Sequence, residues 1–257
     1  MMRFRTLKDG RVVVTNASLT PLIFNSLEDW NNWKHSHSDA NESQDIRQPE
    51  GIFWEISRLL VRLLGTAGLC LTLVFILSHS ILPSARIWAL LDHSLLISFL
   101  LLVLVAIVST VAHELMHMIF GRSIHLSSNL ITFVMRTKLN HIWSWPKLCA
   151  IDALLLGIAL DFALAGVAVL FFLTTGIQFA LFVWSVLVFR ILWQFNIFAK
   201  RDVALTINFL LDKPEGFLHR LDWRVRSGLA IFCDTIYLAC WVFPLLVDLP
   251  QGGFRWL

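Results

Sequence analysis

The chain has 257 residues, of which 57% are hydrophobic and only 15% are charged, and its mean hydropathy is +0.70. Soluble domains are about 45–50% apolar and about 25% charged, so this composition excludes a disordered chain and argues against a water-soluble globule. The net charge of +3 is small and scattered, which argues against a nucleic-acid-binding protein. The four cysteines form no CxxC pair, and we expect free thiols instead of a disulfide framework or a thiolate metal site.

Residues 1–55 are the polar part of the chain and are expected to form a cytoplasmic N-terminal segment. They lack the basic-then-apolar layout of a signal peptide, so no cleavage is expected. Val12–Val14, which follow a Gly, predict a short strand. Trp30–Pro49 are rich in Asn, Ser and His, a composition typical of a flexible linker. Residues 56–257 are predicted to form one multi-span membrane domain.

Long apolar runs follow Ile56 and determine the fold class. A helix needs about 20 apolar residues to cross the hydrocarbon core of a bilayer. The spanning segments must be helical, because backbone groups that face lipid have to be satisfied within their own segment. We therefore predict an all-α membrane protein with about five transmembrane helices, and an interfacial loop or hairpin after the second. The predicted spans are 63–82, 94–120, 150–173, 178–198 and 228–249.

Lysine and arginine residues alternate between the two sides of these spans. Eight precede the first span, one lies in the first return loop, four lie in the loop 121–149 and six follow the fourth span. The link between the third and fourth spans has none, and the C-terminal tail has one. Because cytoplasmic loops carry the excess of positive charge, we predict a multi-pass protein of the cell membrane with its N-terminus in the cytoplasm and its C-terminus outside.

The most specific motif is His113-Glu114-Leu115-Met116-His117, at the end of the second predicted span. In a helix, positions four apart lie on one face, so both imidazoles can bind a single ion. Zinc is the usual ion for such a pair, together with a third protein ligand and a water. Glu114 would take a proton from that water as general base. The alternative is that the three polar side chains are satisfied by neighbouring helices.

A third ligand has to come from elsewhere in the chain. Glu215 is the only later glutamate and lies in a predicted loop, and His125 lacks the spacing of a third histidine ligand. Asp202 lies at the cytoplasmic end of the fourth predicted span, at the same depth as the two histidines. The alternative for Asp202 is a solvated partner of the adjacent Lys200 or Arg201.

The stretch Asn196–Val203 reads Asn-Ile-Phe-Ala-Lys-Arg-Asp-Val, and Leu210-Leu211 and Pro214 follow it. With the HExxH motif, this stretch resembles the site-2 protease class of intramembrane zinc metalloproteases, and within it the bacterial peptide zinc metalloproteases of peptide-maturation clusters. Those proteins carry HExxH and then Asn–Pro–x–x–Lys–x–Asp–Gly, followed by Leu-Leu and Pro. Here Ile197 replaces the first Pro and Val203 replaces the Gly. The resemblance covers residues 95–220.

The resemblance implies a set of site residues. His113, His117 and Asp202 would be ligands of a Zn²⁺ cofactor, and Glu114 would be the general base. Asn196 would be a polar group near the substrate or the oxyanion, with a helix-terminal hydrogen bond as the alternative.

Two further features of the membrane segment are a pair of opposite charges within the spans and a short segment rich in β-branched residues. Asp161 and Arg190 lie in the third and fourth spans at similar distances from the cytoplasmic face, and we expect a structural ion pair, with a proton pathway as the alternative. Asn129–Met135 is rich in β-branched and aromatic residues and too short to span. Such an edge would pair with an extended substrate, although a membrane-interface segment is the alternative.

These features together favour a membrane-embedded zinc endopeptidase that hydrolyses a peptide bond near the cytoplasmic face. We expect it to remove the leader of a ribosomally made precursor peptide, with residues 1–55 holding the precursor. One alternative is regulated intramembrane proteolysis of a single-span substrate. A second is a non-catalytic accessory or immunity protein with a vestigial HExxH, which the departures at Ile197 and Val203 keep open, and a third is a lipid or small-molecule hydrolase. The expected partners are a peptide or membrane-protein substrate and the lipid bilayer, and no nucleic acid.

Overall fold

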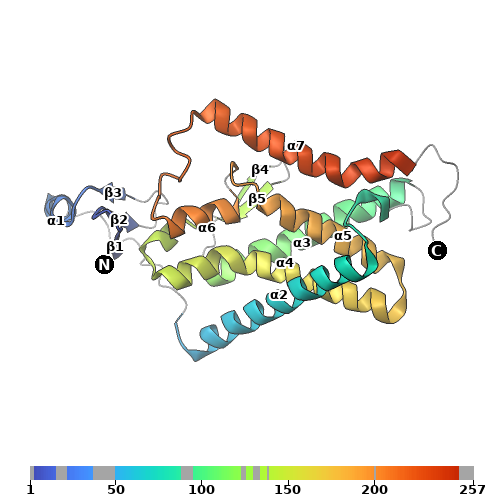
Figure 1. Ribbon diagram of the computed structural model, residues 1–257. Coiled ribbons are helices and arrows are strands. Elements are labelled where there is room, and N and C mark those ends of the chain that lie inside the picture. The colour runs from blue at the N-terminus through green and yellow to red at the C-terminus, as the bar shows by residue number, and fades with distance from the viewer. Residues whose placement is uncertain are drawn as a thin grey trace.

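The computed structural model describes residues 3–15, 22–36, 50–87, 95–122, 126–129, 134–137, 139–199 and 201–248. Most of these residues are helical, and the helices run roughly side by side along one axis (Figure 1). The four that are long and apolar enough to cross a membrane are α2 (Ile52–His79), α3 (Leu95–Gly121), α4 (Lys147–Thr175) and α7 (Trp223–Asp248). The predicted class, an all-α membrane protein, is confirmed at this level.

The fifth predicted span is a shorter helix, α5 (Gln178–Gln194), with 17 residues. At 1.5 Å per residue it is about 26 Å long, close to the roughly 30 Å of the hydrocarbon core. It follows α4 after a tight turn in which Gly176, with a φ of 70°, ends the preceding helix. Helix α5 therefore runs back alongside α4, antiparallel to it (Figure 1). The number of helices that cross the membrane stays a prediction.

Helix α4 lies at the centre of the bundle and packs against α2, α3, α5 and the short helix α6 (Asp202–Leu210). Small residues allow α2 to approach α4 closely. A Cβ atom added to Gly68 would lie 2.0 Å from the Phe162 carbonyl oxygen, and one added to Gly166 would lie 2.5 Å from the Gly68 Cα. Close van der Waals packing of this kind holds helices together in lipid. The hydrophobic effect does not drive their association there, because lipid tails are as apolar as the helix surfaces.

A small antiparallel sheet precedes the bundle, in the order β1 (Arg3–Thr6), β2 (Val12–Thr15) and β3 (Leu22–Phe24). The predicted strand at Val12–Val14 is therefore confirmed. Helix α1 (Leu27–Ser36) follows, so the predicted flexible linker is wrong over Trp30–Ser36, while 37–49 lie outside the described residues. The helix forms because Ser26 Oγ accepts the Asp29 N–H at 3.0 Å and Trp30 is buried against the sheet, 2% exposed.

The sheet is attached to one end of the bundle. Val13 is fully buried on the face opposite Trp30, where β2 packs against a 3₁₀ turn, η2 (Asn140–Ser144). Arg5 forms an ion pair with Asp212 and lies 4.6 Å above the Phe209 ring. Arg11 pairs with Asp9 at 2.8 Å and with Glu215. The polar segment thus contacts both η2 and the chain around the end of α6.

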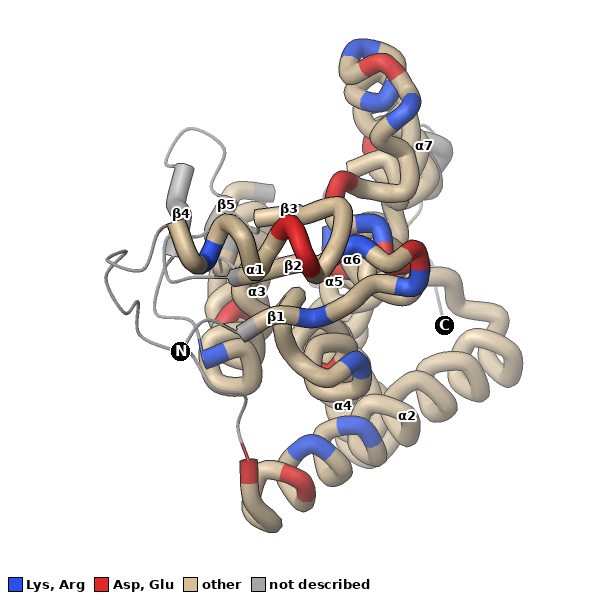
Figure 2. The backbone as a smooth tube through the Cα atoms, turned by 90° about the vertical axis from the view of Figure 1, so that its left-hand side faces the viewer, with Lys and Arg blue, Asp and Glu red and all other residues tan. Residues whose placement is uncertain are grey.

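A β-hairpin follows α3 directly and consists of β4 (Leu126–Asn129) and β5 (Val134–Thr137). The structure therefore contains the predicted hairpin after the second span. The single strand predicted at Asn129–Met135 is instead divided between the two arms, and 130–133 lie outside the described residues. Charged residues gather at the end of the molecule that carries the N-terminal sheet, which faces the viewer in Figure 2.

Candidate metal centre

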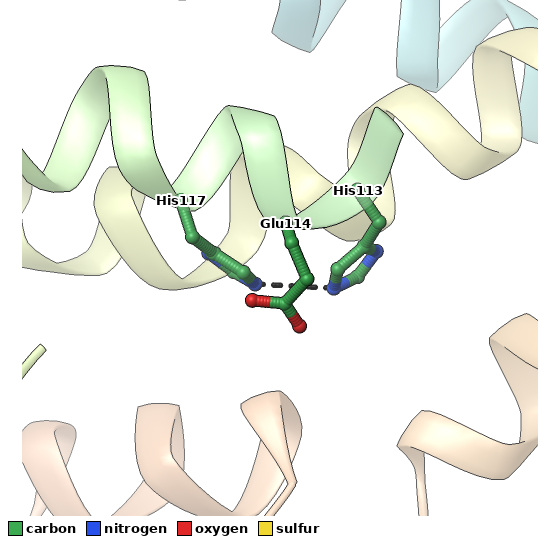
Figure 3. A group of neighbouring side chains, drawn as sticks. All are labelled: His113, Glu114 and His117. Carbon is green, nitrogen blue, oxygen red and sulfur yellow. Dashed lines mark hydrogen bonds between the residues drawn. The ribbon is translucent and has the colours of Figure 1, made fainter. Parts of the chain in front are cut away.

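The HExxH motif lies in the last three turns of α3 and faces the interior of the protein. His113, Glu114 and His117 are 2%, 9% and 3% exposed. The two imidazoles, one helical turn apart, have their Nε2 atoms 3.1 Å from each other, and the Glu114 carboxylate lies beside them (Figure 3). One ligand atom from each of the three side chains lies within 4.8 Å of the others.

Asp202 completes this arrangement from a distant part of the sequence. It is the first residue of α6, and its Oδ2 lies 2.8 Å from His113 Nε2 and 3.2 Å from His117 Nε2. In a tetrahedral zinc site with bonds of about 2.0–2.1 Å, ligand atoms lie roughly 3.3 Å apart. Two imidazole nitrogens and one carboxylate oxygen therefore converge with a spacing and a chemistry that fit one small divalent ion.

The chain around Asp202 fixes its position. An acidic residue in the first turn of a helix is favoured by the helix dipole, and Asp202 occupies that place in α6. The preceding Arg201 pairs with Asp234 of α7 at 2.8 Å and lies 4.8 Å above the Trp193 ring. Its ion pair is thus with Asp234, whereas the alternative drawn from the sequence paired it with Asp202. Lys200, the other basic neighbour, lies outside the described residues.

The second nitrogen of each histidine donates to a buried acceptor. His117 Nδ1 lies 2.7 Å from the Ala153 carbonyl oxygen, and His113 Nδ1 lies 2.7 Å from Asp161 Oδ2. These bonds place the protons on Nδ1, so that the Nε2 lone pairs are available where Asp202 lies. Both acceptors are on α4, which therefore supports the two imidazoles from behind.

The approach of α4 to His113 depends on a glycine. A Cβ atom added to Gly157 would lie 2.8 Å from both His113 Cε1 and His113 Nε2. No real Cβ contact is this short, so a larger residue would displace the imidazole ring or the helix. Gly157 was not among the residues that sequence reasoning selected. Its only signal was its position one turn before Asp161 on the helix that faces the motif.

Glu114 is held by the hairpin. Its Oε2 accepts the backbone N–H and the hydroxyl of Thr137, each at 2.8 Å. Thr137 is the last residue of β5, so the carboxylate next to the histidines is connected directly to the β4–β5 hairpin.

The charge of Asp202 suits a ligand. Burial acts to raise the pKa of its carboxyl, but His117 and His113, in their protonated metal-free form, lower it, and the net effect is a pKa well below the ordinary value. The carboxylate is therefore anionic at neutral pH, which is the form that binds a metal ion.

The predicted oxyanion residue, Asn196, has other partners. Its amide donates to the Ala230 carbonyl oxygen at 2.8 Å and to Asp234 Oδ1 at 2.7 Å, and its Oδ1 accepts the Phe198 N–H at 3.1 Å. Asn196 therefore makes hydrogen bonds at the end of a helix, which was the alternative drawn from the sequence. These bonds join the end of α5 to α7. Glu215 pairs with Arg11 away from the histidines.

Asp161 and Arg190 form the predicted ion pair, with Asp161 Oδ2 3.0 Å from Arg190 Nη2. The contact between Asp161 and His113 was not predicted, because sequence reasoning paired charges with charges and left the imidazoles to the metal. No protein-family model, curated protein or solved structure matches the chain.

Proposed function

We propose that the chain is a membrane-embedded zinc endopeptidase of the site-2 protease type. The observation that supports this most strongly is the convergence of His113 Nε2, His117 Nε2 and Asp202 Oδ2 within 3.2 Å of one another at the buried end of a membrane helix. The departures from the family pattern at Ile197 and Val203 do not prevent α6 from presenting Asp202 to the histidines. A vestigial motif would not require this convergence.

A bound zinc ion would supply Lewis acidity for the scissile carbonyl and for a water molecule. The protein residues would then handle the protons. Glu114 takes a proton from the attacking water and later donates it to the leaving amine, a role for which its position beside both imidazoles is suited. Burial of the histidines excludes bulk water from the centre and strengthens every electrostatic interaction there.

The hairpin provides a place for an extended substrate. Because the Thr137 N–H points to Glu114, one edge of β5 faces the proposed base, while the other edge pairs with β4. A peptide that adds to the edge near Glu114 as a strand would expose its backbone to the centre, whereas a helical peptide would keep its amides internally bonded. The substrate we propose is therefore an extended peptide segment.

We further propose that this segment belongs to a ribosomally made precursor peptide, from which the enzyme removes the leader on the cytoplasmic side of the cell membrane. The N-terminal sheet lies beside η2 and the end of α6, at the charged end of the bundle where such a peptide would arrive. Regulated cleavage of a single-span protein is the other substrate class that the same site would serve.

The activity is tested with the full-length protein in detergent micelles containing Zn²⁺. It is incubated with a library of peptides derived from denatured cytosolic proteins, and new peptide ends are identified by mass spectrometry. We expect cleavage by the wild-type protein and none by Glu114→Gln. A phospholipid mixture is assayed in parallel. Peptide ends produced equally by Glu114→Gln, or lipid hydrolysis without peptide cleavage, would refute the proposal.

A further inference from the structure

A buried aspartate on α4 holds the imidazole of one candidate ligand. Asp161 is fully buried, and its Oδ2 accepts the N–H of His113 Nδ1 at 2.7 Å. The same oxygen lies 3.0 Å from Arg190 Nη2 on α5, and Arg190 Nη1 donates to Thr110 Oγ1 at 2.5 Å. Four side chains from three helices thus form one connected polar network that ends at His113.

An ion pair that only stabilises the bundle does not explain this network. Such a pair needs Asp161 and Arg190 alone, yet Asp161 Oδ2 contacts both Arg190 and the imidazole. The same helix carries a second buried aspartate, whose ion-pair partners are arginines. Asp152 is 6% exposed and pairs with Arg62, whose Nε lies 2.9 Å from its Oδ1, and its Oδ2 lies 4.0 Å from Arg58 Nε. The histidine contact is what distinguishes Asp161.

A carboxylate that accepts the Nδ1 proton of a histidine fixes the tautomer and the ring orientation, and makes Nε2 a better metal ligand. In this protein His113 Nε2 is the atom that lies 2.8 Å from Asp202 Oδ2, so the ring orientation decides whether the three ligand atoms converge. Arg190 in turn pairs with Asp161 at 3.0 Å inside a membrane helix, where an unpaired carboxylate would be costly.

We infer that Asp161 is a positioning residue that orients His113 and so determines how tightly the centre binds a divalent metal ion. Arg190 and Thr110 hold the Asp161 carboxylate in place. This inference rests on the proposed metalloprotease function, because it assigns Asp161 to the same centre.

The test measures metal affinity apart from activity. The full-length protein in detergent is stripped of metal, and Co²⁺ is added in competition with a chelator while the ligand-field absorption is recorded. Asp161→Asn is expected to weaken Co²⁺ binding about 10- to 100-fold. Because Asp161→Asn leaves Arg190 unpaired, a second variant, Asp161→Leu with Arg190→Met, removes the pair as a unit and leaves no buried charge. It is expected to lose affinity in the same way.

Asp152→Asn is the matched control, since it breaks an ion pair on the same helix without touching His113. It is expected to bind Co²⁺ as the wild-type protein does. If both Asp161 variants bind Co²⁺ with wild-type affinity, or if Asp152→Asn loses as much affinity as they do, the positioning role is wrong and the proposed centre stands. If the wild-type protein itself binds no Co²⁺ through these ligands, the proposed function is wrong and this inference fails with it.

Discussion

Asp202 Oδ2 lies 2.8 Å from His113 Nε2, although 89 positions separate the two residues in the sequence. The histidine comes from the last turns of α3 and the aspartate from the first turn of α6, and α4 packs against both helices. The centre is therefore assembled by packing around α4. Substitutions on α4, which itself supplies none of the three candidate ligands, are therefore expected to alter metal binding when they contact the imidazole of a ligand.

Gly157→Ala is expected to weaken metal binding without unfolding the protein. The added methyl would lie 2.8 Å from His113 Nε2 and would push the imidazole away from Asp202. Overpacking of this kind typically costs about 1–3 kcal/mol. If this cost destabilises the metal-bound state, the affinity falls roughly 5- to 150-fold. The measurement is the Co²⁺ dissociation constant. Gly228→Ala on α7, with open space around the added methyl, is the control, and equal affinities for the two variants would contradict the prediction.

Gly68→Val is expected to separate α2 from α4. Its Cβ would lie 2.0 Å from the Phe162 carbonyl oxygen, a backbone atom that has no freedom to move aside. We expect a loss of at least about 1–3 kcal/mol in the free energy of unfolding, seen as a lower midpoint of thermal unfolding in detergent. Gly228→Val controls for the lower helix propensity of valine. An unfolding midpoint for Gly68→Val equal to that of the control would show that α2 does not pack as described.

Thr137→Val is expected to lower the rate of peptide cleavage while the zinc content stays unchanged. The substitution keeps the shape of the side chain and removes the hydroxyl that donates to Glu114 Oε2 at 2.8 Å. A hydrogen bond to a charged group contributes about 1.5–3 kcal/mol, so kcat is expected to fall roughly 10- to 100-fold. Thr137→Ser retains the hydroxyl and should keep most of the activity. Wild-type turnover in Thr137→Val would mean that the hairpin does not orient the base.

Acid is expected to weaken the attachment of the N-terminal sheet. Partial burial acts to raise the pKa of Glu215, but the Arg11 guanidinium lowers it below its ordinary value of 4.5. Because the pKa is lower in the folded state, the ion pair stabilises the protein above about pH 4.5 and loses its effect as the pH falls through the lower folded value. Glu215→Gln should therefore unfold at a slightly lower temperature than the wild-type protein at about pH 7 and at the same temperature at about pH 3. A difference that is constant across this range would contradict the prediction.

Much of the fold followed from composition and pattern. Apolar runs of span length predict α2, α3, α4 and α7 because lipid forces them to be helical. Helix α1 was missed because its surroundings are rich in Asn and Ser, while its stability comes from Trp30, which packs on a sheet that pattern reading recognised only at Val12–Val14. Tertiary burial overrode local composition at this point.

The site was predictable as far as its motif and the approach of Asp202 to the two histidines. The spacing of His113 and His117 places both imidazoles on one face, and the end of the fourth span brings Asp202 to their level. The partners of those residues were not predictable, because they depend on the rotation of α4 about its axis. That rotation decides that Asp161 contacts His113 and that Gly157 lies under the ring. Similarly, the position of α7 decides that Asn196 contacts Ala230.

The most direct measurement is the zinc content of the purified full-length protein and of two isosteric variants. We predict about one zinc ion per chain in the wild-type protein and in Glu114→Gln, because the proposed function makes Glu114 the general base and assigns the ligand positions to His113, His117 and Asp202. We predict a large loss of zinc in Asp202→Asn, whose amide is a poorer ligand than the carboxylate that lies within 3.2 Å of both imidazoles. Zinc in Asp202→Asn equal to that of the wild-type protein, or a wild-type protein that binds none, would contradict the account.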